Sequence, residues 1–224
     1  MRTFIHEEID LGYEDLVAET TARGRTYAIP DGSRYPSITT VLSLLTEDSI
    51  AAWRKRVGDD EANRIGSRAA NRGTQVHAIV ERYLRNEDTS EYLPHIQQSL
   101  ENLKPILDER IGKIFHLEAP LFSSHLGLAG RVDCIAEFDG VPSIIDFKTS
   151  RWPKKKEKIP NYFAQMSGYA VMFEERTGMP IVNTVIIMDV DNENPLVFKE
   201  HRDNYIQLLI DTKKEYDRRQ LFGH

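Results

Sequence analysis

Hydrophobic positions in the first half of the chain recur every three to four residues, the spacing of amphipathic helices. The clearest apolar stripe lies within residues 73–84 and consists of Val76, Ile79, Val80 and Tyr83. Other segments of this half share the helical pattern, and they run from the N-cap Ser37 to Leu45, over 48–70 and over 91–111.

Residues 1–36 lack this helical period. Their turn signal, Pro30-Asp31-Gly32, lies near the end of the segment, so we expect irregular or weakly stranded structure there. We find no repeats and no low-complexity linkers in the chain. We therefore expect one domain over residues 1–224, in which 1–72 form an N-terminal helical extension and 73–224 form the core.

The second half of the chain contains short segments rich in Val, Ile and Phe, which predict strands. These segments are His116–Phe122, Gly130–Phe138, Val141–Lys148, Ile181–Val190 and Leu196–His201. One helix over residues 158–176 interrupts them, and a last helix over 203–221 closes the chain. This order predicts an α/β fold, bordering on α+β, with a central mixed sheet of five strands flanked by helices.

The composition is ordinary for a soluble protein. Of 224 residues, 40% are apolar and 29% are charged, enough to bury a core. No apolar run approaches the ~20 residues that span a bilayer, and the N-terminus lacks the apolar stretch of a signal peptide. We therefore expect an intracellular, cytoplasmic protein. The single cysteine, Cys134, excludes a disulfide within the chain and a cysteine-ligated zinc or iron–sulfur centre.

The charge distribution matters more than the net charge. A formal net charge of −6 argues weakly against nucleic acid as a partner. Basic residues are nevertheless clustered, in Arg54-Lys55-Arg56, in the series Arg64, Arg68 and Arg72, and in Arg151, Lys154-Lys155-Lys156 and Lys158. Solvated surface explains each cluster alone about as well as a nucleic-acid contact does.

A hairpin is predicted around Asp139-Gly140, because this dipeptide between two apolar runs favours a two-residue type I′ turn. Such a turn pairs Phe138 with Val141. Counting back from that pair places Asp133 directly opposite Asp146. Directly opposed side chains share a face of the sheet, with Cβ atoms ~4.5–5.5 Å apart.

The same count places Lys148 on the face of Asp146, opposite Arg131, while the other face of the hairpin is apolar. Two facing carboxylates are destabilising unless something holds them together. A divalent cation such as Mg²⁺ or Mn²⁺ suits oxygen ligands at this separation. The alternative is a surface lattice of ion pairs among Asp133, Asp146, Arg131 and Lys148.

The order Asp133, then Ile-Ile-Asp146-Phe-Lys148 at the end of the next strand, resembles the PD-(D/E)xK nuclease signature. Val132 stands in place of the motif's proline. Two flanking segments are similar to elements of RecB-type nucleases: Gly73-Thr-Gln-Val-His77 to their GxxxH element, and Gln165-Met-Ser-Gly-Tyr169 to their QxxxY element. The stretch from Gly127 to Asp133 also resembles that group.

A narrower resemblance begins at Tyr35-Pro-Ser-Ile-Thr-Thr-Val-Leu42, which is followed by Trp53. This pattern is similar to the mitochondrial genome maintenance exonuclease family and its phage-encoded relatives, from about residue 35 to 220. The resemblance implies a restriction-endonuclease-like core. Some members of the wider group carry a four-cysteine iron–sulfur cluster, which a chain with one cysteine cannot hold.

The resemblance also implies a metal site for one or two Mg²⁺ or Mn²⁺ ions. Its ligands would be Asp133, Asp146, the backbone carbonyl of Phe147, and His77. A histidine beside an apolar stripe is more often structural, but its spacing from the glycine of the GxxxH element favours a ligand here. Glu118 on the first strand is a candidate outer ligand, and a solvated carboxylate is an equally good interpretation.

The remaining roles concern water and phosphate. Lys148 would orient or help deprotonate the attacking water and offset charge on the phosphate. Gln165 would position Lys148 or the water. Gly73 would leave room for a phosphate or for close packing, and Tyr169 belongs either to the site or to the core.

Two basic segments that contain a tryptophan predict single-strand binding, because charge holds the backbone and a ring stacks on bases. The candidate DNA-binding residues are Trp53, Arg54, Gly73, Arg131, Trp152, Lys154, Lys155, Lys156 and Tyr169. The resemblance to the exonuclease family implies that helices before the core arch over the site and admit only an unpaired strand. Packing of Trp53 in the core is the alternative.

The sequence therefore predicts a Mg²⁺- or Mn²⁺-dependent deoxyribonuclease that hydrolyses single-stranded DNA from free ends. The expected setting is replication, repair or recombination of a phage or organelle-like genome, in the host cytoplasm if phage-encoded, with proteins of those processes as candidate partners. A structure-specific endonuclease and a catalytically inactive nucleic-acid-binding module are the alternatives. The intact set of Asp133, Asp146 and Lys148 argues against the inactive module.

Overall fold

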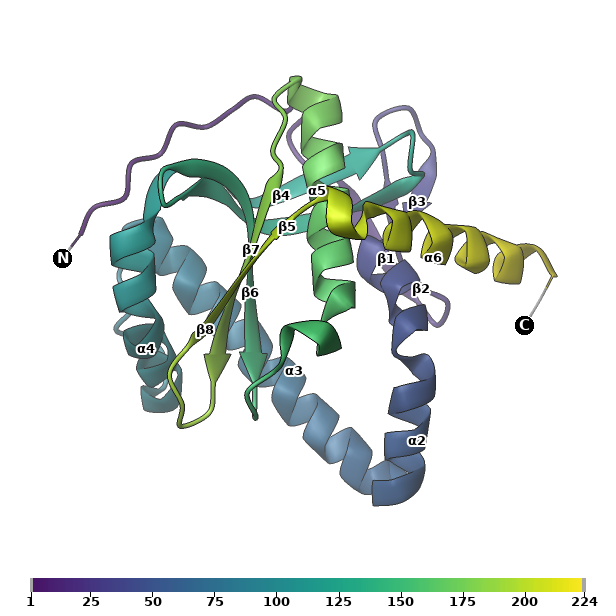
Figure 1. Cartoon of the computed structure of the whole chain (residues 1–224), viewed down its shortest axis with the longest axis horizontal. Coiled ribbons are helices and arrows are strands. Elements are labelled where there is room, and N and C mark those ends of the chain that lie inside the picture. Colours follow the sequence, from purple (N-terminus) through teal and green to yellow (C-terminus); the bar gives the residue numbers. More distant parts are fainter. Residues whose placement is uncertain (1, 223–224) are drawn as a thin grey trace.

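A computed structural model describes residues 2–222 of the chain (Figure 1). The helical elements are α1 (Ile38–Leu42), η1 (Ser43–Leu45), α2 (Glu47–Val57), α3 (Asp59–Leu84), α4 (Pro94–Arg110), η2 (Lys156–Lys158), α5 (Pro160–Thr177) and α6 (Asp203–Phe222). The strands are β1 (Val17–Thr21), β2 (Gly24–Ala28), β3 (Arg34–Pro36), β4 (Ile111–Ser123), β5 (Leu128–Phe138), β6 (Val141–Ser150), β7 (Asn183–Val190) and β8 (Leu196–His201). None of the helices within residues 2–222 combines the length and apolar character that crossing a bilayer requires.

The central sheet has the strand order β4-β5-β6-β7-β8. Only β6 and β7 run parallel, because α5 crosses over between them, and the other neighbours are antiparallel. Helices α3 and α4 cover one face of this sheet, and α1, α5 and α6 cover the other (Figure 1). The expected mixed five-stranded sheet flanked by helices is therefore confirmed.

The N-terminal region contains more strand structure than the sequence indicated. Strands β1, β2 and β3 form a second, antiparallel sheet with β2 in the middle. The expected turn lies between β2 and β3, where Gly32 has φ +86° and the side chain of Asp31 accepts a hydrogen bond of 2.7 Å from the Ser33 amide. The segment was hard to recognise because every residue of β1 is exposed, so it has no apolar face.

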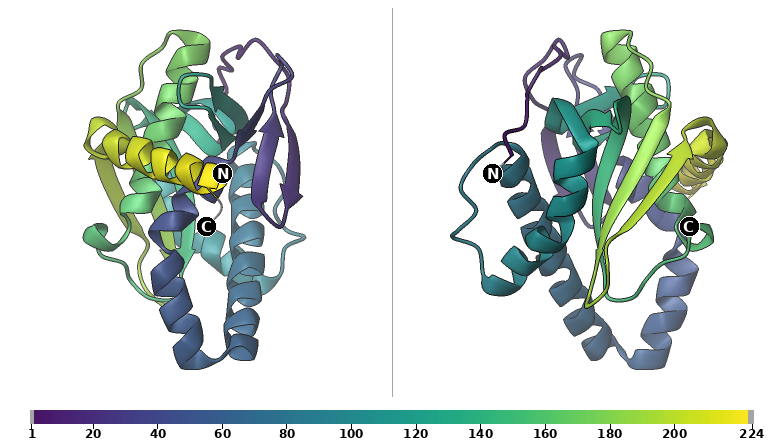
Figure 2. Two further views of the ribbon diagram at one scale, coloured as in Figure 1. Left: turned by 90° about the vertical axis from the view of Figure 1, so that its right-hand side faces the viewer. Right: turned by 60° about the vertical axis from the view of Figure 1, so that its left-hand side comes forward.

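The helical segments expected over 48–70 and 73–84 are divided differently in the structure, because α3 runs without interruption from Asp59 to Leu84. The actual break lies at Gly58, whose φ of +87° ends α2 and reverses the chain. Helix α2 buries none of its residues, and the α2–α3 hairpin projects from the body of the molecule (Figure 2). The expected boundary between extension and core thus falls inside a helix.

The β5–β6 hairpin has the predicted turn and register. Asp139 and Gly140 have φ of +53° and +76°, as a type I′ turn requires, and Phe138 pairs with Val141. The ladder ends at the pair of Cys134 with Ile145. The predicted pairing of the next two residues is therefore not formed, and the strands separate at that level.

The separation has a local cause. The carboxylate of Asp133 accepts a hydrogen bond of 2.9 Å from the Phe147 amide, which takes the place of a ladder bond. Beyond this point β5 pairs only with β4, so Arg131 lies opposite Pro120 rather than opposite Lys148 as the sequence suggested. The end of β6 pairs with β7 alone.

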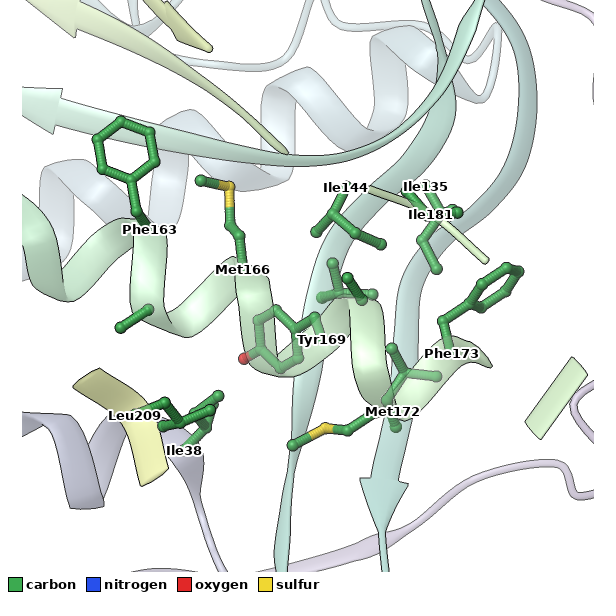
Figure 3. Close-up of a cluster of buried hydrophobic side chains, with 14 of the residues drawn as sticks. Ile38, Ile135, Ile144, Phe163, Met166, Tyr169, Met172, Phe173, Ile181 and Leu209 are labelled. Carbon is green, nitrogen blue, oxygen red and sulfur yellow. The ribbon is translucent and has the colours of Figure 1, made fainter. Parts of the chain in front are cut away.

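Both faces of the hairpin are buried, because helices cover the central sheet on each side. On the α5 side, Tyr169, Ile38 and Leu209 belong to one hydrophobic cluster (Figure 3). Two glycines allow this close packing. A Cβ on Gly130 would lie 2.8 Å from the Tyr169 ring, and one on Gly168 would lie 2.3 Å from the end of Ile38.

We expect the substitution Gly130→Ala to lower the free energy of unfolding by roughly 1–3 kcal/mol, because the added methyl must displace a buried aromatic ring. Gly66→Ala is the matched control, since Gly66 lies in exposed α3 with nothing within 4 Å of an added Cβ. It should stabilise the protein by ~0.5–1 kcal/mol through helix propensity. Urea denaturation measures both, and a Gly130→Ala protein as stable as wild type would contradict the packing described.

Candidate active site

A pocket of about 840 Å³ opens where α3, the central sheet and α5 meet the N-terminal sheet. It brings together residues from opposite ends of the chain. The predicted site residues that line it are Gly73, His77, Glu118, Arg131, Asp133, Lys148, Gln165 and Tyr169. Asp146 lies below the pocket floor, with 1% of its surface exposed.

Three side chains in the pocket can converge on one ion. His77 from α3, Glu118 from β4 and Asp133 from β5 each offer a ligand atom, and these atoms lie within 4.8 Å of one another. The His77 Nδ1 is 3.4 Å from the Asp133 Oδ2. This oxygen is also the one that accepts the Phe147 amide, so the backbone of β6 fixes its position.

Glu118 is held in an unusual conformation. Its neighbours Leu117 and Ala119 pair with β5, and Glu118 lies between them at the level of Asp133 with φ +53°. Arg131 donates a hydrogen bond of 2.6 Å from its Nη1 to the Glu118 carbonyl. A non-glycine residue in this region of φ costs free energy and is common at functional sites, where surrounding contacts maintain it.

The second carboxylate, Asp146, is buried and is paired with Lys148, which lines the pocket. Their side chains form an ion pair, and the ammonium lies 5.3 Å from the centre of the Tyr162 ring. Within residues 2–222, neither oxygen of Asp146 accepts a hydrogen bond of normal geometry. A buried carboxylate with unsatisfied oxygens is costly unless a further positive partner binds it.

Burial and neighbouring charges shift the pKa values of these groups. Burial, with Asp133 and Glu81 nearby, raises the pKa of Glu118 to about 7. Burial opposes the charged form of His77, but the Asp133 carboxylate outweighs it, so the pKa of His77 is raised. Burial would likewise raise the pKa of Asp133, but His77 and Lys148 hold it below its usual value.

The Asp146–Lys148 pair shows the same competition. Burial raises the pKa of Asp146 to about 6, despite the nearby ammonium. Burial disfavours the charged form of Lys148, but Asp146 and Asp133 outweigh it and raise the pKa of the lysine. Lys148 is therefore a cation at neutral pH.

The donor set fits a divalent cation. Carboxylate oxygens and an imidazole nitrogen are both ordinary ligands of divalent metal ions. Glu118, the candidate outer ligand, lies among the residues whose ligand atoms can converge on one ion, and its role as a ligand stays a prediction. Phe147 contributes its amide to Asp133, and its carbonyl as a metal ligand stays a prediction.

Gln165 and Tyr169 lie one turn apart on α5 at the pocket wall. The Gln165 Nε2 donates to the Tyr169 hydroxyl at 3.4 Å, while the Tyr169 ring is packed against Gly130. Burial raises the pKa of Tyr169 well above its usual value. Tyr169 therefore belongs to the core and to the pocket lining at once. Gly73 faces Thr149, whose Oγ1 would lie 3.7 Å from an added Cβ.

The other candidate DNA-binding residues lie outside the lining of this pocket as far as residues 2–222 are concerned. Trp152 is 68% exposed on the loop after β6, which also carries Lys154 and Lys155. Lys156 forms an ion pair with Glu200 on β8. Trp53 is half-buried on α2, and Arg54 beside it binds the side chains of Asp59 and Asn63.

Arg72 has a role that the sequence did not indicate. From α3 it pairs with Asp189 on β7 and with Asp191 beyond it, at 2.5 and 2.9 Å. Asp189 is buried, and its Oδ1 has no hydrogen-bond partner within residues 2–222. Because Gly73 and His77 follow Arg72 on the same helix, this pair fixes the part of α3 that lines the pocket. The spacing of Arg64, Arg68 and Arg72 could not distinguish this residue from the two others.

Replacing Arg72 with alanine would leave Asp189 as a buried carboxylate without its cation. We expect Arg72→Ala to lower the free energy of unfolding by about 3 kcal/mol. The double variant Arg72→Met, Asp189→Leu should recover much of this loss, because it removes both charges. Arg64→Ala, on the exposed part of α3, is the control and should leave the unfolding midpoint unchanged. A midpoint of Arg72→Ala equal to that of the control would show that the pair does not anchor α3.

Comparison with known proteins agrees with this geometry. A sequence model described as the PD-(D/E)XK nuclease superfamily matches residues 51–218. Mitochondrial genome maintenance exonuclease 1 of Homo sapiens is 29% identical over 130 residues, which cover 53% of this chain and 38% of that protein. This chain thus spans well under half of the relative's length. A solved structure from Eubacterium rectale, provisionally named an exonuclease, has a TM-score of 0.47 and 14% identity over 67% of this chain and 66% of its own.

The family match covers most of the chain and includes the strands and helices that carry His77, Glu118, Asp133, Asp146, Lys148 and Gln165. The chain therefore belongs to the PD-(D/E)XK nuclease superfamily.

Proposed function

We propose that this nuclease is a Mg²⁺- or Mn²⁺-dependent exonuclease that degrades single-stranded DNA from free ends. The observation that carries the proposal is the convergence of His77, Glu118 and Asp133 in one pocket. Lys148, the partner of the buried Asp146, lines the same pocket. Superfamily membership makes phosphodiester hydrolysis the chemistry of this site. Metal requirement, strand preference and end dependence are the proposed refinements.

Glu118, Asp133 and His77 would hold the metal, with Asp146 contributing an oxygen that has no hydrogen-bond partner in residues 2–222. A bound divalent ion supplies an activated water and neutralises charge on the scissile phosphate. The raised pKa of Lys148 keeps it protonated, so it acts by charge. In this proposal Lys148 orients the water and stabilises the phosphate in the transition state, rather than removing the proton. Gln165 acts beside it as a hydrogen-bonding group.

Single-strand preference is supported by what surrounds the pocket. The loop after β6 exposes Trp152 next to Lys154 and Lys155, a combination of ring and charge that suits unpaired bases. The projecting α2–α3 hairpin carries Trp53 and Arg54, and its second helix continues to Gly73 and His77 at the pocket. Aromatic rings beside basic side chains favour an unpaired strand, whose bases can stack on the rings, over a duplex.

The name of the human relative refers to maintenance of a mitochondrial genome. By analogy we place this protein in the replication, repair or recombination of a comparably small genome, phage or organellar, within the cytoplasm of the cell that harbours it. Its protein partners would belong to those processes. The alternatives are a structure-specific endonuclease and an inactive binding module.

Linear and circular single strands with Mg²⁺ distinguish these functions. We expect the linear strand to be degraded and the circle to remain intact. Asp146→Ala and Lys148→Ala should each lower the rate at least ~100-fold, because each removes charge from the reacting centre. Lys214→Ala on the exposed face of α6 is the control and should behave as wild type. Cutting of the circle would mean an endonuclease, and binding without any cutting would mean an inactive module.

Metal binding should weaken as the pH falls below about 7. The pKa of Glu118 is raised to about 7 and that of Asp146 to about 6, so both carboxyls are partly protonated in this range. The pKa of His77 is raised as well. A ligand must lose its proton to bind a cation, so protons compete with the metal at low pH. The affinity for Mn²⁺ should therefore rise between about pH 5.5 and 8.

Calorimetric titration in two buffers of different ionisation enthalpy measures both the affinity and the protons released. Glu118→Gln should release fewer protons and show a shallower dependence on pH. An affinity for Mn²⁺ that stays constant over this range would contradict the assigned ligands.

A further inference from the structure

The N-terminal sheet forms one wall of the active-site pocket. Ala18 and Thr20 of β1 and Arg25 and Tyr27 of β2 line it, opposite the side formed by α3 and the central sheet. These residues precede residue 51, where the match to the superfamily begins. This wall is therefore formed by residues outside the segment that matches the superfamily.

Arg25 is held at a defined position in this wall by its own backbone. Its amide donates a hydrogen bond of 3.0 Å to the Thr40 hydroxyl, and its carbonyl accepts one of 2.8 Å from the Ser37 amide. The preceding Gly24 has φ +112°, and a Cβ there would lie 2.3 Å from Thr40 Cγ2. Glycine thus allows β2 to dock directly onto the first turn of α1.

Helix α1 connects this wall to the residues around the metal site. Its Ile38 is fully buried and lies against the positions of Gly130 and Gly168. Gly130 precedes Asp133 on β5, and Gly168 lies between Gln165 and Tyr169 on α5. The backbone of Arg25 is therefore fixed relative to the same elements that position the candidate metal ligands.

The charge of Arg25 remains available. Lys148 pairs with Asp146, and Arg131 pairs with Asp15, so these two pocket cations are neutralised. Arg25 is exposed and forms no ion pair with any residue between 2 and 222. Its one side-chain hydrogen bond in that range runs from Nε to the Thr20 hydroxyl at 3.3 Å. The terminal nitrogens of the guanidinium are left to bind an anion from the pocket.

We propose that Arg25, supported by Thr20, binds a backbone phosphate of the substrate strand next to the scissile one. Guanidinium matches phosphate in geometry and charge, and a contact of this kind does not depend on base identity. The acidic part of the pocket would take the metal and the scissile group, while the wall opposite would hold the neighbouring phosphate. This proposal rests on the function proposed above, because it requires a polynucleotide in the pocket.

The test compares Arg25→Gln with wild type on a linear single-stranded oligonucleotide. Fluorescence anisotropy in EDTA measures binding without cutting, and initial rates in Mg²⁺ give kcat and KM. We expect Kd and KM to rise about tenfold and kcat to change little, because one charged hydrogen-bonding contact to the strand is lost. The slope of log Kd against log salt should decrease by about one. Arg25→Lys should recover part of the affinity.

Arg34→Gln is the matched control, because Arg34 lies on the neighbouring strand β3, pairs with Glu19 and does not line the pocket. It should retain the wild-type Kd and salt slope. If wild type binds and cuts but Arg25→Gln equals this control, the phosphate contact is wrong while the nuclease function stands. A wild type that neither binds nor cuts a single strand would overturn both. A fall in kcat alone, with Kd and salt slope unchanged, would also overturn the contact.

Discussion

The hydrogen bond from the Phe147 amide to the Asp133 carboxylate is the point on which the site depends. It follows the last pair of the β5–β6 ladder, Cys134 with Ile145, and lets the two strands part, so that β5 continues with β4 and β6 with β7. The position of the Asp133 carboxylate is therefore fixed by a hydrogen bond to the backbone of β6, and not only by the preferred rotamer of its own side chain. The opening between the strands is where His77 can approach from α3 and Glu118 from β4. The pocket thus lies where the β5–β6 pairing is interrupted, and the Asp133 side chain stabilises this interruption.

Three anchors surround this opening and determine its shape. The pair of Arg72 and Asp189 fixes α3 at the carboxyl end of β7, so that His77 faces Asp133. The packing of Ile38 against Gly130 and Gly168 brings α1 and α5 together on the other face. Strand β2 packs on α1 and forms a further wall of the pocket, which carries the cation of Arg25. Each anchor joins segments that are distant in sequence, which makes the geometry of the pocket a property of the whole fold.

Much of the fold could be predicted from local signals. The Asp139-Gly140 turn, the strands around it and the helix stripe at Val76 to Tyr83 are short-range patterns, and all were found. Two local signals misled. The helical segments expected over 48–70 and 73–84 were divided before Gly73, whereas the helices are divided at Gly58. The exposed residues of β1 gave no alternation, because β1 is the edge strand of its sheet and the small core beneath that sheet takes its buried side chain from β2, at Tyr27.

The sequence by itself determined the candidate residues of the site: two aspartates and a lysine around one predictable turn, with a histidine and a glutamine at motif spacing. These are features of residue type and local register, which short-range sterics and hydrogen bonding govern. Tertiary structure alone decided that Glu118 joins His77 and Asp133, that Arg72 is an anchor, and that Arg25 faces the pocket. Each of these depends on contacts between elements far apart in the chain. Their formation follows from packing over both faces of the sheet, which no local pattern encodes.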